Sequence, residues 1–379
     1  MSSVAVSHPL MSREFRVNSY LLLSLYTIIP VAILTVLVDK LFLGNVLRDH
    51  YLPSNPATLL VWAIVFNFPH IVSSLVTLAD DEYIPYYKKR FGKALMIIIA
   101  GVLLVNVLLP MVLEPKYATG LYGLFFIFFA TYTMYHVLSQ QFGIGMMLMK
   151  VRPTKHYESW RWLSTFATAA MYGMVFAKPN LQAAQFGAYT VYDMALVFAL
   201  VFVVLATIVG LTLTFGSQRR LGTVYVTTNV IMLIATLSLL YLDYSFFVIA
   251  IPRFVHDITA FIIYSTHDQN RNREVQHNYI YRFLSFLSIP PIILCPLLAI
   301  VLANSVECGA YMLDVGLGFS HIASECVVSR FYHPVVENGL PLSMQVGLQI
   351  MFICGFFHYH IESFVWKREA IHRHSVAFS

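Results

Sequence analysis

Four histidines, each in a separate apolar segment, are the residues of this sequence best suited to chemistry: His70, His136, His256 and His358. Imidazole nitrogens bind zinc, copper, iron and nickel, and the sequence contains no CxxC motif that would add a pair of thiolate ligands. Ionisable side chains are costly inside a bilayer, so their presence in apolar segments indicates a functional site. The sequence therefore predicts that these four histidines hold a metal ion.

Each of these histidines has polar neighbours that could orient a ligand or take part in chemistry. His136 and Gln140, and likewise His358 and Glu362, are four residues apart, which places each pair on one face of a helix. Metal-bound imidazoles usually have a partner on the other ring nitrogen. The candidates for such supporting or catalytic roles are Asn67, Gln140, Asp257, Glu362, Arg253 and Tyr264. Arg253 also has a purely structural reading as the partner of Asp257, four residues on.

A second cluster is predicted further along the same segment as His256. His267 follows His256 by eleven residues, about 16 Å along a helix, so one ion cannot bind both. His267 and Asp268, grouped with His360, form either a second metal site or an ordinary polar cluster at the membrane interface, and the second reading is favoured. His372, in the C-terminal tail, is expected to be solvated.

Composition shows which elements must position these residues. Of the 379 residues, 58% are hydrophobic and 11% are charged, whereas soluble domains average about 25% charged residues. Apolar runs of 18 residues or more predict an all-α, polytopic transmembrane helix bundle that forms a single domain over residues 1–379. The net charge of +5 does not indicate a nucleic-acid partner, because basic residues in a membrane protein mark its cytoplasmic loops.

Ten membrane spans are predicted from the apolar runs. They cover residues 20–38, 57–78, 94–113, 119–149, 161–177, 193–215, 222–242, 244–267, 280–303 and 342–366. With the N-terminus inside, 18 lysines and arginines fall on the cytoplasmic side and 5 on the other. This bias predicts that both termini are cytoplasmic. The expected location is a bacterial inner membrane.

The longest connection, residues 304–341, is predicted to be an extracytoplasmic loop within the bundle. It contains Cys308 and Cys326, which could pair as a disulfide in an oxidising compartment.

The predicted topology brings the four histidines to one depth. They lie on the second, fourth, eighth and tenth spans, which all run in the same direction through the membrane. Counted back from the next charged cytoplasmic residue, each histidine is about 14 to 22 Å into the helix. One histidine from each of four helices at a shared level is the arrangement that a single buried site requires.

The pattern resembles that of integral-membrane, histidine-ligated iron oxygenases, in particular the prokaryotic β-carotene-cleaving dioxygenases of the Brp/Blh type. The resemblance lies in the positions of His70, His136, His256 and His358 on separate spans. It implies that these four residues bind one iron and that the substrate is lipid-like or carotenoid-like. Membrane desaturases and hydroxylases fit less well, because their dense paired-histidine boxes are absent.

The leading hypothesis is a membrane-embedded, metal-dependent oxygenase or oxidoreductase that acts on a hydrophobic substrate taken from the surrounding lipids. Iron is the expected metal, with copper or zinc as alternatives. A zinc hydrolase would use Glu362 or Asp257 as its base. A transporter or proton or metal carrier would use the same histidines as a relay, and a membrane haem protein would use them as axial ligands. The sequence predicts no oligomeric state.

Overall fold

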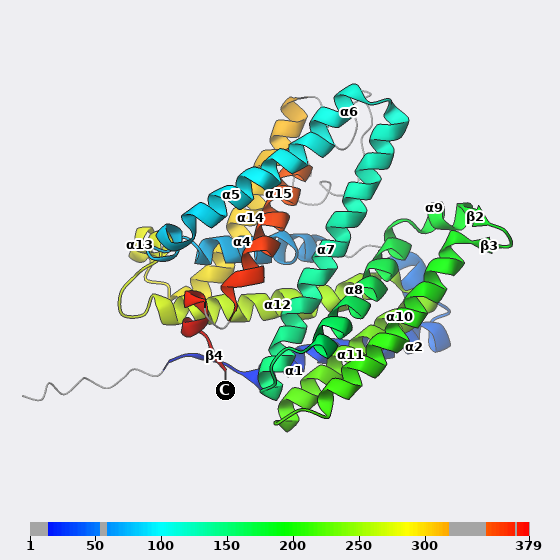
Figure 1. Cartoon of the computed structure of the whole chain (residues 1–379), viewed down its shortest axis with the longest axis horizontal. Coiled ribbons are helices and arrows are strands. Elements are labelled where there is room, and N and C mark those ends of the chain that lie inside the picture. The colour runs from blue at the N-terminus through cyan, green and yellow to red at the C-terminus, as the bar shows by residue number, and fades with distance from the viewer. Residues whose placement is uncertain (1–13, 54–58, 318–345, 368–369, 379) are drawn as a thin grey trace, which may run out of the picture.

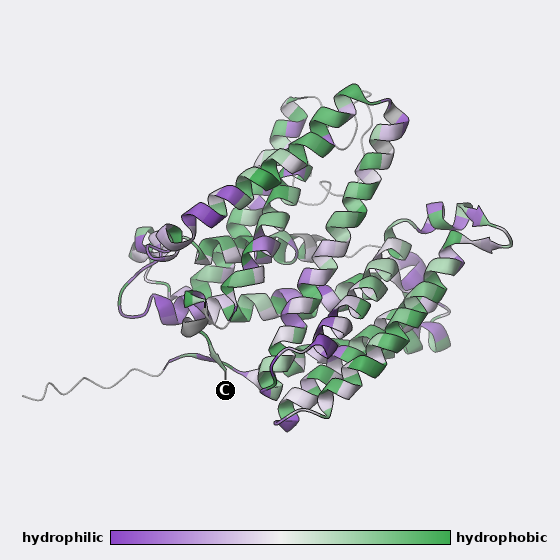
Figure 2. Cartoon of the chain, viewed as in Figure 1, coloured by the Kyte–Doolittle hydropathy of each residue, from purple (hydrophilic) through white to green (hydrophobic). Residues whose placement is uncertain are grey.

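The computed structural model describes residues 14–53, 59–317, 346–367 and 370–378. These residues form a helical bundle in which the strands are only two residues long, which confirms the predicted all-α class. Figure 2 shows hydrophobic residues along the helices and hydrophilic residues mainly at their ends. This distribution is typical of a protein that crosses a membrane.

Ten α-helices lie in the described residues of the first half of the chain. They are α1 (Ser19–Ser24), α2 (Ile28–Phe42), α3 (Leu60–Val65), α4 (Phe68–Thr77), α5 (Tyr83–Leu103), α6 (Leu109–Val112), α7 (Pro115–Met149), α8 (Lys155–Phe176), α9 (Lys178–Ala183) and α10 (Val191–Thr214). The 3-10 turn η1 (Leu25–Thr27) joins α1 to α2, and the π-helical turns are η2 (Leu47–Tyr51) and η4 (Leu104–Leu108).

The second half of the chain contains five further described α-helices, two 3-10 turns and the strand β4. Its helices are α11 (Arg220–Tyr241), α12 (Ser245–Arg271), α13 (Tyr279–Phe283), α14 (Pro291–Gly316) and α15 (Val346–Val365), with 3-10 turns η5 (Ser285–Leu287) and η9 (Ile371–Ser375). The strands β1 (Arg16–Val17) and β4 (Ala377–Phe378) pair in parallel, and β2 (Gln185–Phe186) pairs with β3 (Tyr189–Thr190) in antiparallel orientation.

Seven helices in the described part of the chain are long and apolar enough to cross a membrane. They are Ser19–Phe42, Tyr83–Val112, Lys116–Met149, Val191–Thr214, Arg220–Tyr241, Ser245–Arg271 and Pro291–Gly316. The other predicted spans correspond to α8, α15 and the pair α3 and α4. The count of ten spans and the cytoplasmic location of both termini stay predictions.

The predicted span 57–78 is not one continuous helix. It breaks between α3 and α4 at Asn67, whose backbone has φ +72° and ψ −101°. Residues other than glycine rarely adopt a positive φ, so this conformation must be held by surrounding contacts. α4 has ten residues and is about 15 Å long, too short to cross a bilayer alone. Because of the break, Asn67 precedes α4 and does not share a helical face with His70.

The helices form two groups with α12 and α7 between them (Figure 1). On one side α10 packs against α8 and α11, and on the other α14 packs against α4 and α15, while α15 also packs against α5. α12 contacts both groups. In its most hydrophobic stretch 72% of the residues are buried, against 56% or less in the other candidate spans. The helix with the most ionisable residues is therefore the centre of the bundle.

The predicted loop 304–341 begins later than expected, because α14 continues as a helix to Gly316. Most of this stretch, residues 318–341, lies outside the described part of the chain. Cys308 lies within α14 and is disulfide-bonded. Its predicted partner, Cys326, is outside the described residues.

Both ends of the described chain meet at the C-terminal end of α12. β1 and β4 pair there, and Asn270 contacts both tails: its amide nitrogen donates to the carbonyls of Phe15 (2.8 Å) and Ser375 (3.0 Å). The Phe15 N–H donates back to the Asn270 side-chain oxygen at 2.9 Å. The two ends of the described chain, near Phe15 and Ser375, therefore lie on the same side of the bundle.

Candidate metal centre

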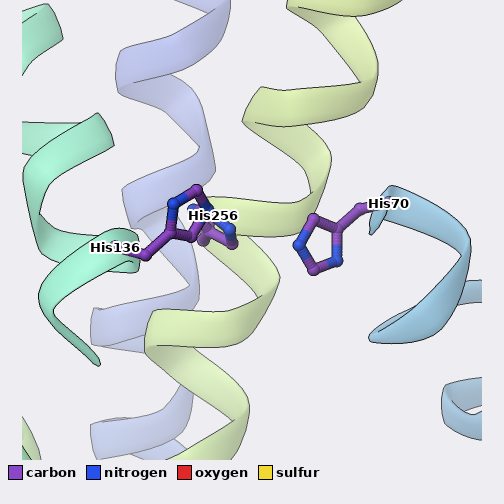
Figure 3. A group of neighbouring side chains, drawn as sticks. All are labelled: His70, His136 and His256. Carbon is purple, nitrogen blue, oxygen red and sulfur yellow. The ribbon is translucent and has the colours of Figure 1, made fainter. Parts of the chain in front are cut away.

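The four predicted histidines come together at the centre of the bundle. His70 lies on α4, His136 on α7, His256 on α12 and His358 on α15, and none is more than 6% exposed. Figure 3 shows His136 and His256 close together, with His70 pointing toward them from the opposite side. We refer to His70, His136, His256 and His358 as the four-histidine cluster.

The rings of the four-histidine cluster form a closed quadrilateral. The ring centroid of His70 lies 5.0 Å from that of His256 and 5.2 Å from that of His358. The centroid of His136 lies 5.2 Å from that of His256 and 4.8 Å from that of His358. With metal–nitrogen bonds of about 2.1 Å, four imidazoles around one ion have neighbouring centroids about 4.6 to 5.3 Å apart. The spacing of neighbouring rings in the cluster therefore matches that of imidazoles around one ion.

The ring nitrogens of the cluster are buried without hydrogen-bond partners in the described structure. They comprise both nitrogens of His70 and His256 and the Nε2 atoms of His136 and His358. A buried polar atom without a partner costs about 1 to 3 kcal/mol, so six together are unexpected unless a ligand satisfies them. An ion bound by one nitrogen of each ring would supply the missing partner of four of these six atoms.

Ser74 fixes the tautomer of His358. Its hydroxyl donates to the carbonyl of Ile71 at 2.7 Å and lies 2.7 Å from His358 Nδ1. A hydroxyl has one proton to donate, so Ser74 must accept the Nδ1–H of His358. This leaves the lone pair on Nε2, which lies 3.9 Å from Glu362 Oε1, and the ligand atoms of His358, Glu362 and His136 form one compact group. His358 is thereby prepared as an Nε2 ligand.

The possible ligand atoms fall into two groups that share His136. One consists of His70, His136 and His256, and the other of His136, His358 and Glu362, with all atoms in each group within 4.8 Å of one another. Glu362 Oε2 lies 3.4 Å from His136 Nε2, and Oε1 lies 3.9 Å from His358 Nε2. The Glu362 carboxylate therefore lies next to the Nε2 atoms of His136 and His358 that could bind an ion.

Two residues predicted to support the site contact Glu362. The Tyr264 hydroxyl donates to Glu362 Oε1, and the Gln140 amide nitrogen lies 3.5 Å from Oε2. Among the described residues, no lysine or arginine pairs with Glu362. Its charge can therefore be balanced only by a proton or by a cation in the cluster.

Asp257 lies on the opposite side of the cluster and has a different environment. Its Oδ1 is 3.3 Å from His70 Nδ1, and its Oδ2 accepts the Asn67 N–H at 2.8 Å. Arg253 lies 3.6 Å from Asp257 Oδ2 and donates to the Asn67 side-chain oxygen. Arg253 and Asp257 thus neutralise each other, as the structural reading of the pair predicted. Together they hold Asn67 in its unusual backbone conformation and so place the start of α4.

The structure brings together two of the three residues of the second predicted cluster. His267 and Asp268 are buried and hydrogen-bonded to each other, His267 Nδ1 lying 2.8 Å from Asp268 Oδ1. His360 is not part of this cluster: it is half-buried and lies against Phe364, with ring centroids 5.5 Å apart. It follows His358 by two residues, which turns its side chain to the other face of α15.

His372 and Tyr83 are the members of this second cluster that the sequence did not reveal. His372 was expected to be solvated, but it is 1% exposed and its ring stacks on Tyr83 at 3.6 Å. Tyr83 donates to or accepts from His267 Nε2 at 3.0 Å. The signal for His372 was weak, because a histidine in a polar tail gives no indication of burial. Tyr83 is the first residue of the apolar helix α5, and a tyrosine at the end of such a helix is common, so it did not indicate a functional role.

Comparison of the chain with models of known families, with characterised proteins and with solved structures gives no match. The arguments about function that follow rest on the residues and on their geometry.

Proposed function

We propose that this protein is a membrane-embedded, metal-dependent oxygenase whose metal is held by the four-histidine cluster and whose substrate is a hydrophobic small molecule from the bilayer. The observation that carries the proposal is the closed set of four buried imidazoles with unpartnered nitrogens. Neutral imidazoles can bind a cation in an apolar layer without adding buried negative charge. We expect one metal ion per chain.

Iron is the metal we propose, with copper and zinc as alternatives. All-nitrogen sites suit these three metals, and neither free cysteine, Cys295 or Cys354, belongs to the two groups of ligand atoms in the described structure. Bound iron would supply the capacity to bind and reduce dioxygen. Four rings that each neighbour two others fit a single ion, whereas a haem needs a wide planar gap between its two axial ligands.

The residues around the cluster have distinct proposed roles. Asp257, through Asn67 and Arg253, positions His70, and Ser74 positions His358. Glu362 and Tyr264 can hold a proton next to the ion, since their hydrogen bond lies on the ligand side of the cluster. Apolar substrates suit the aromatic side chains beside His136, where Tyr359 lies 4.5 Å away and packs against Tyr132 and Phe129.

The proposed setting is a bacterial inner membrane, with both termini in the cytoplasm. The apolar helices and the predominance of basic residues at one side support this setting. The membrane lipids are then both the surroundings of the protein and the medium from which the substrate arrives.

Elemental analysis of detergent-purified protein tests the proposal. Each variant His70→Ala, His136→Ala, His256→Ala and His358→Ala should lose most of its bound metal and its substrate-dependent oxygen consumption. His360→Ala is the matched control, because this histidine lies on the same helix as His358 and outside the cluster. Undiminished metal in all four variants would contradict the proposal. Ion movement across liposomes without oxygen consumption would identify a carrier, and a Soret band would identify a haem protein.

A further inference from the structure

A second group of buried side chains lies toward the C-terminal end of α12. His267 Nδ1 is 2.8 Å from Asp268 Oδ1, and His267 Nε2 is 3.0 Å from the Tyr83 hydroxyl. None of the three residues is more than 1% exposed. Asp268 is held in place by hydrogen bonds from Thr77 Oγ1, at 3.0 Å, and from the Tyr281 hydroxyl. These contacts order a carboxylate, an imidazole and a phenol in series.

The series has a direction. An ionised carboxylate only accepts hydrogen bonds, so the proton of neutral His267 lies on Nδ1, which faces Asp268. The Nε2 lone pair then accepts the Tyr83 O–H. The phenol of Tyr83 therefore has a base in place for its proton, and Asp268 can stabilise the imidazolium that forms when His267 accepts it.

Aromatic and polar contacts connect this series to the four-histidine cluster. The ring of Trp366 lies 5.9 Å from that of His267 and 5.4 Å from that of Tyr264, measured between centroids. The Tyr264 hydroxyl donates to Glu362, which lies 3.4 Å from His136 Nε2. An indole ring interrupts any chain of proton transfers, but indole and phenol rings can each carry an electron. The connection is suited to electrons, and proton movement is confined to Tyr83 and His267.

Tyr83 is buried, and this excludes roles in which its hydroxyl must contact a substrate. Arg271 lies over the ring, 5.1 Å from its centroid, and is paired with Asp80 at 2.9 Å. His372 covers the ring by stacking at 3.6 Å. A nucleophile or general base needs contact with its substrate, whereas loss of an electron over a distance with a local proton shift needs none.

We propose that Tyr83 is a redox-active tyrosine that gives up one electron toward the four-histidine cluster while its proton passes to His267. The O–H bond of Tyr83 breaks, its proton goes to His267 Nε2, and Tyr83 becomes a neutral phenoxyl radical. The electron would leave through Trp366 and Tyr264 toward the four-histidine cluster, where a bound metal ion kept oxidised by dioxygen would supply the acceptor. A one-electron reductant at this end of the bundle restores Tyr83, and His267 returns the proton. This inference rests on the proposed function for its electron acceptor.

The first arm of the test uses metal-free protein and therefore does not depend on the proposed function. The protein is treated with hexachloroiridate(IV), a one-electron oxidant, and tyrosyl radicals are measured by freeze-quench electron paramagnetic resonance. Tyrosyl radicals should form about tenfold faster in the wild-type protein than in Tyr83→Phe or His267→Gln. Tyr87→Phe is the matched control, because Tyr87 lies one turn away in α5, is also buried and stacks on Phe91. Equal rates in wild type and Tyr83→Phe would overturn the inference.

The second arm uses iron-loaded protein with verified metal content and hydrogen peroxide as oxidant. The Tyr83 radical should form more slowly in Trp366→Phe, by about tenfold, because phenylalanine is far harder to oxidise than tryptophan. An unchanged rate in this variant would exclude the proposed route. Failure to bind metal would instead remove the proposed function, and the first arm would still decide whether Tyr83 is the preferred site of oxidation.

Discussion

At the scale of single residues, the site depends on how each imidazole is held. His358 has a defined hydrogen bond from Nδ1 to Ser74, whereas His70 is near Asp257 and both nitrogens of His256 lack partners among the described residues. Residues that orient metal-bound histidines commonly change metal affinity or activity by about 10- to 100-fold when they are removed. Ser74 is therefore the supporting residue whose removal gives the clearest result.

Ser74→Ala should weaken metal binding by about 10- to 100-fold, because Nδ1 of His358 loses its acceptor and the ring can rotate. Competition against a chelator of known affinity measures the effect. Ser73→Ala is the control: Ser73 is also buried and also donates to a carbonyl three residues back, that of His70, at 2.6 Å. Equal affinity in Ser74→Ala and Ser73→Ala would contradict the assigned role.

At the scale of elements, the break between α3 and α4 determines where His70 lies. Asn67 occupies a positive φ that glycine tolerates and alanine does not. Asn67→Gly and Asn67→Ala both remove the side chain that Arg253 contacts, so the difference between them isolates the backbone. We expect the alanine variant to be less stable than the glycine variant by about 1 to 2 kcal/mol. Thermal unfolding of both variants measures this difference, and alanine equal to or better than glycine would show that the break is not strained.

The C-terminal segment should undock as the pH falls. Burial is the main cause that lowers the pKa of His372 to about 2, and the nearby side chains of His267 and Arg271 contribute to this value in the same direction. The docked segment therefore binds fewer protons than the free one. Docking is complete above pH 6.5 and weakens as the pH falls below it, by up to about 1.4 kcal/mol per pH unit.

Hydrogen exchange of residues 370–378 at pH 7.5 and pH 5.0 measures this undocking. His372→Phe keeps an aromatic ring against Tyr83 and Tyr87 and removes the titrating group, so its exchange should depend much less on pH. The same pH dependence in wild type and His372→Phe would show that another group controls the segment.

At the scale of the whole molecule, the pairing of β1 with β4 predicts that both termini lie on one side of the membrane. Protease sites added at each end should be cleaved together in inside-out vesicles and protected together in right-side-out vesicles. Cleavage of one end only in either preparation would contradict the arrangement. The basic residues predict that the shared side is the cytoplasm.

The sequence predicts the parts of this molecule that depend on regular helices. His136 with Gln140 and His358 with Glu362 were placed correctly, because spacing along a continuous helix fixes both the face and the depth of a side chain. The break in the predicted span 57–78 at Asn67 was missed, because it is held by Arg253 and Asp257 from another helix and cannot be read from local spacing. The contacts of Tyr83 with His267 and His372 also depend on packing between distant segments.

X-ray absorption at the metal edge of the purified protein tests the central claim most directly. Four imidazole ligands should appear as about four nitrogen neighbours at about 2.1 Å, with the outer-shell scattering of imidazole rings. The imidazole signal should fall by one ligand in His256→Ala and remain unchanged in His360→Ala. Protein without bound metal, or a metal whose neighbours include no imidazole, would contradict the account.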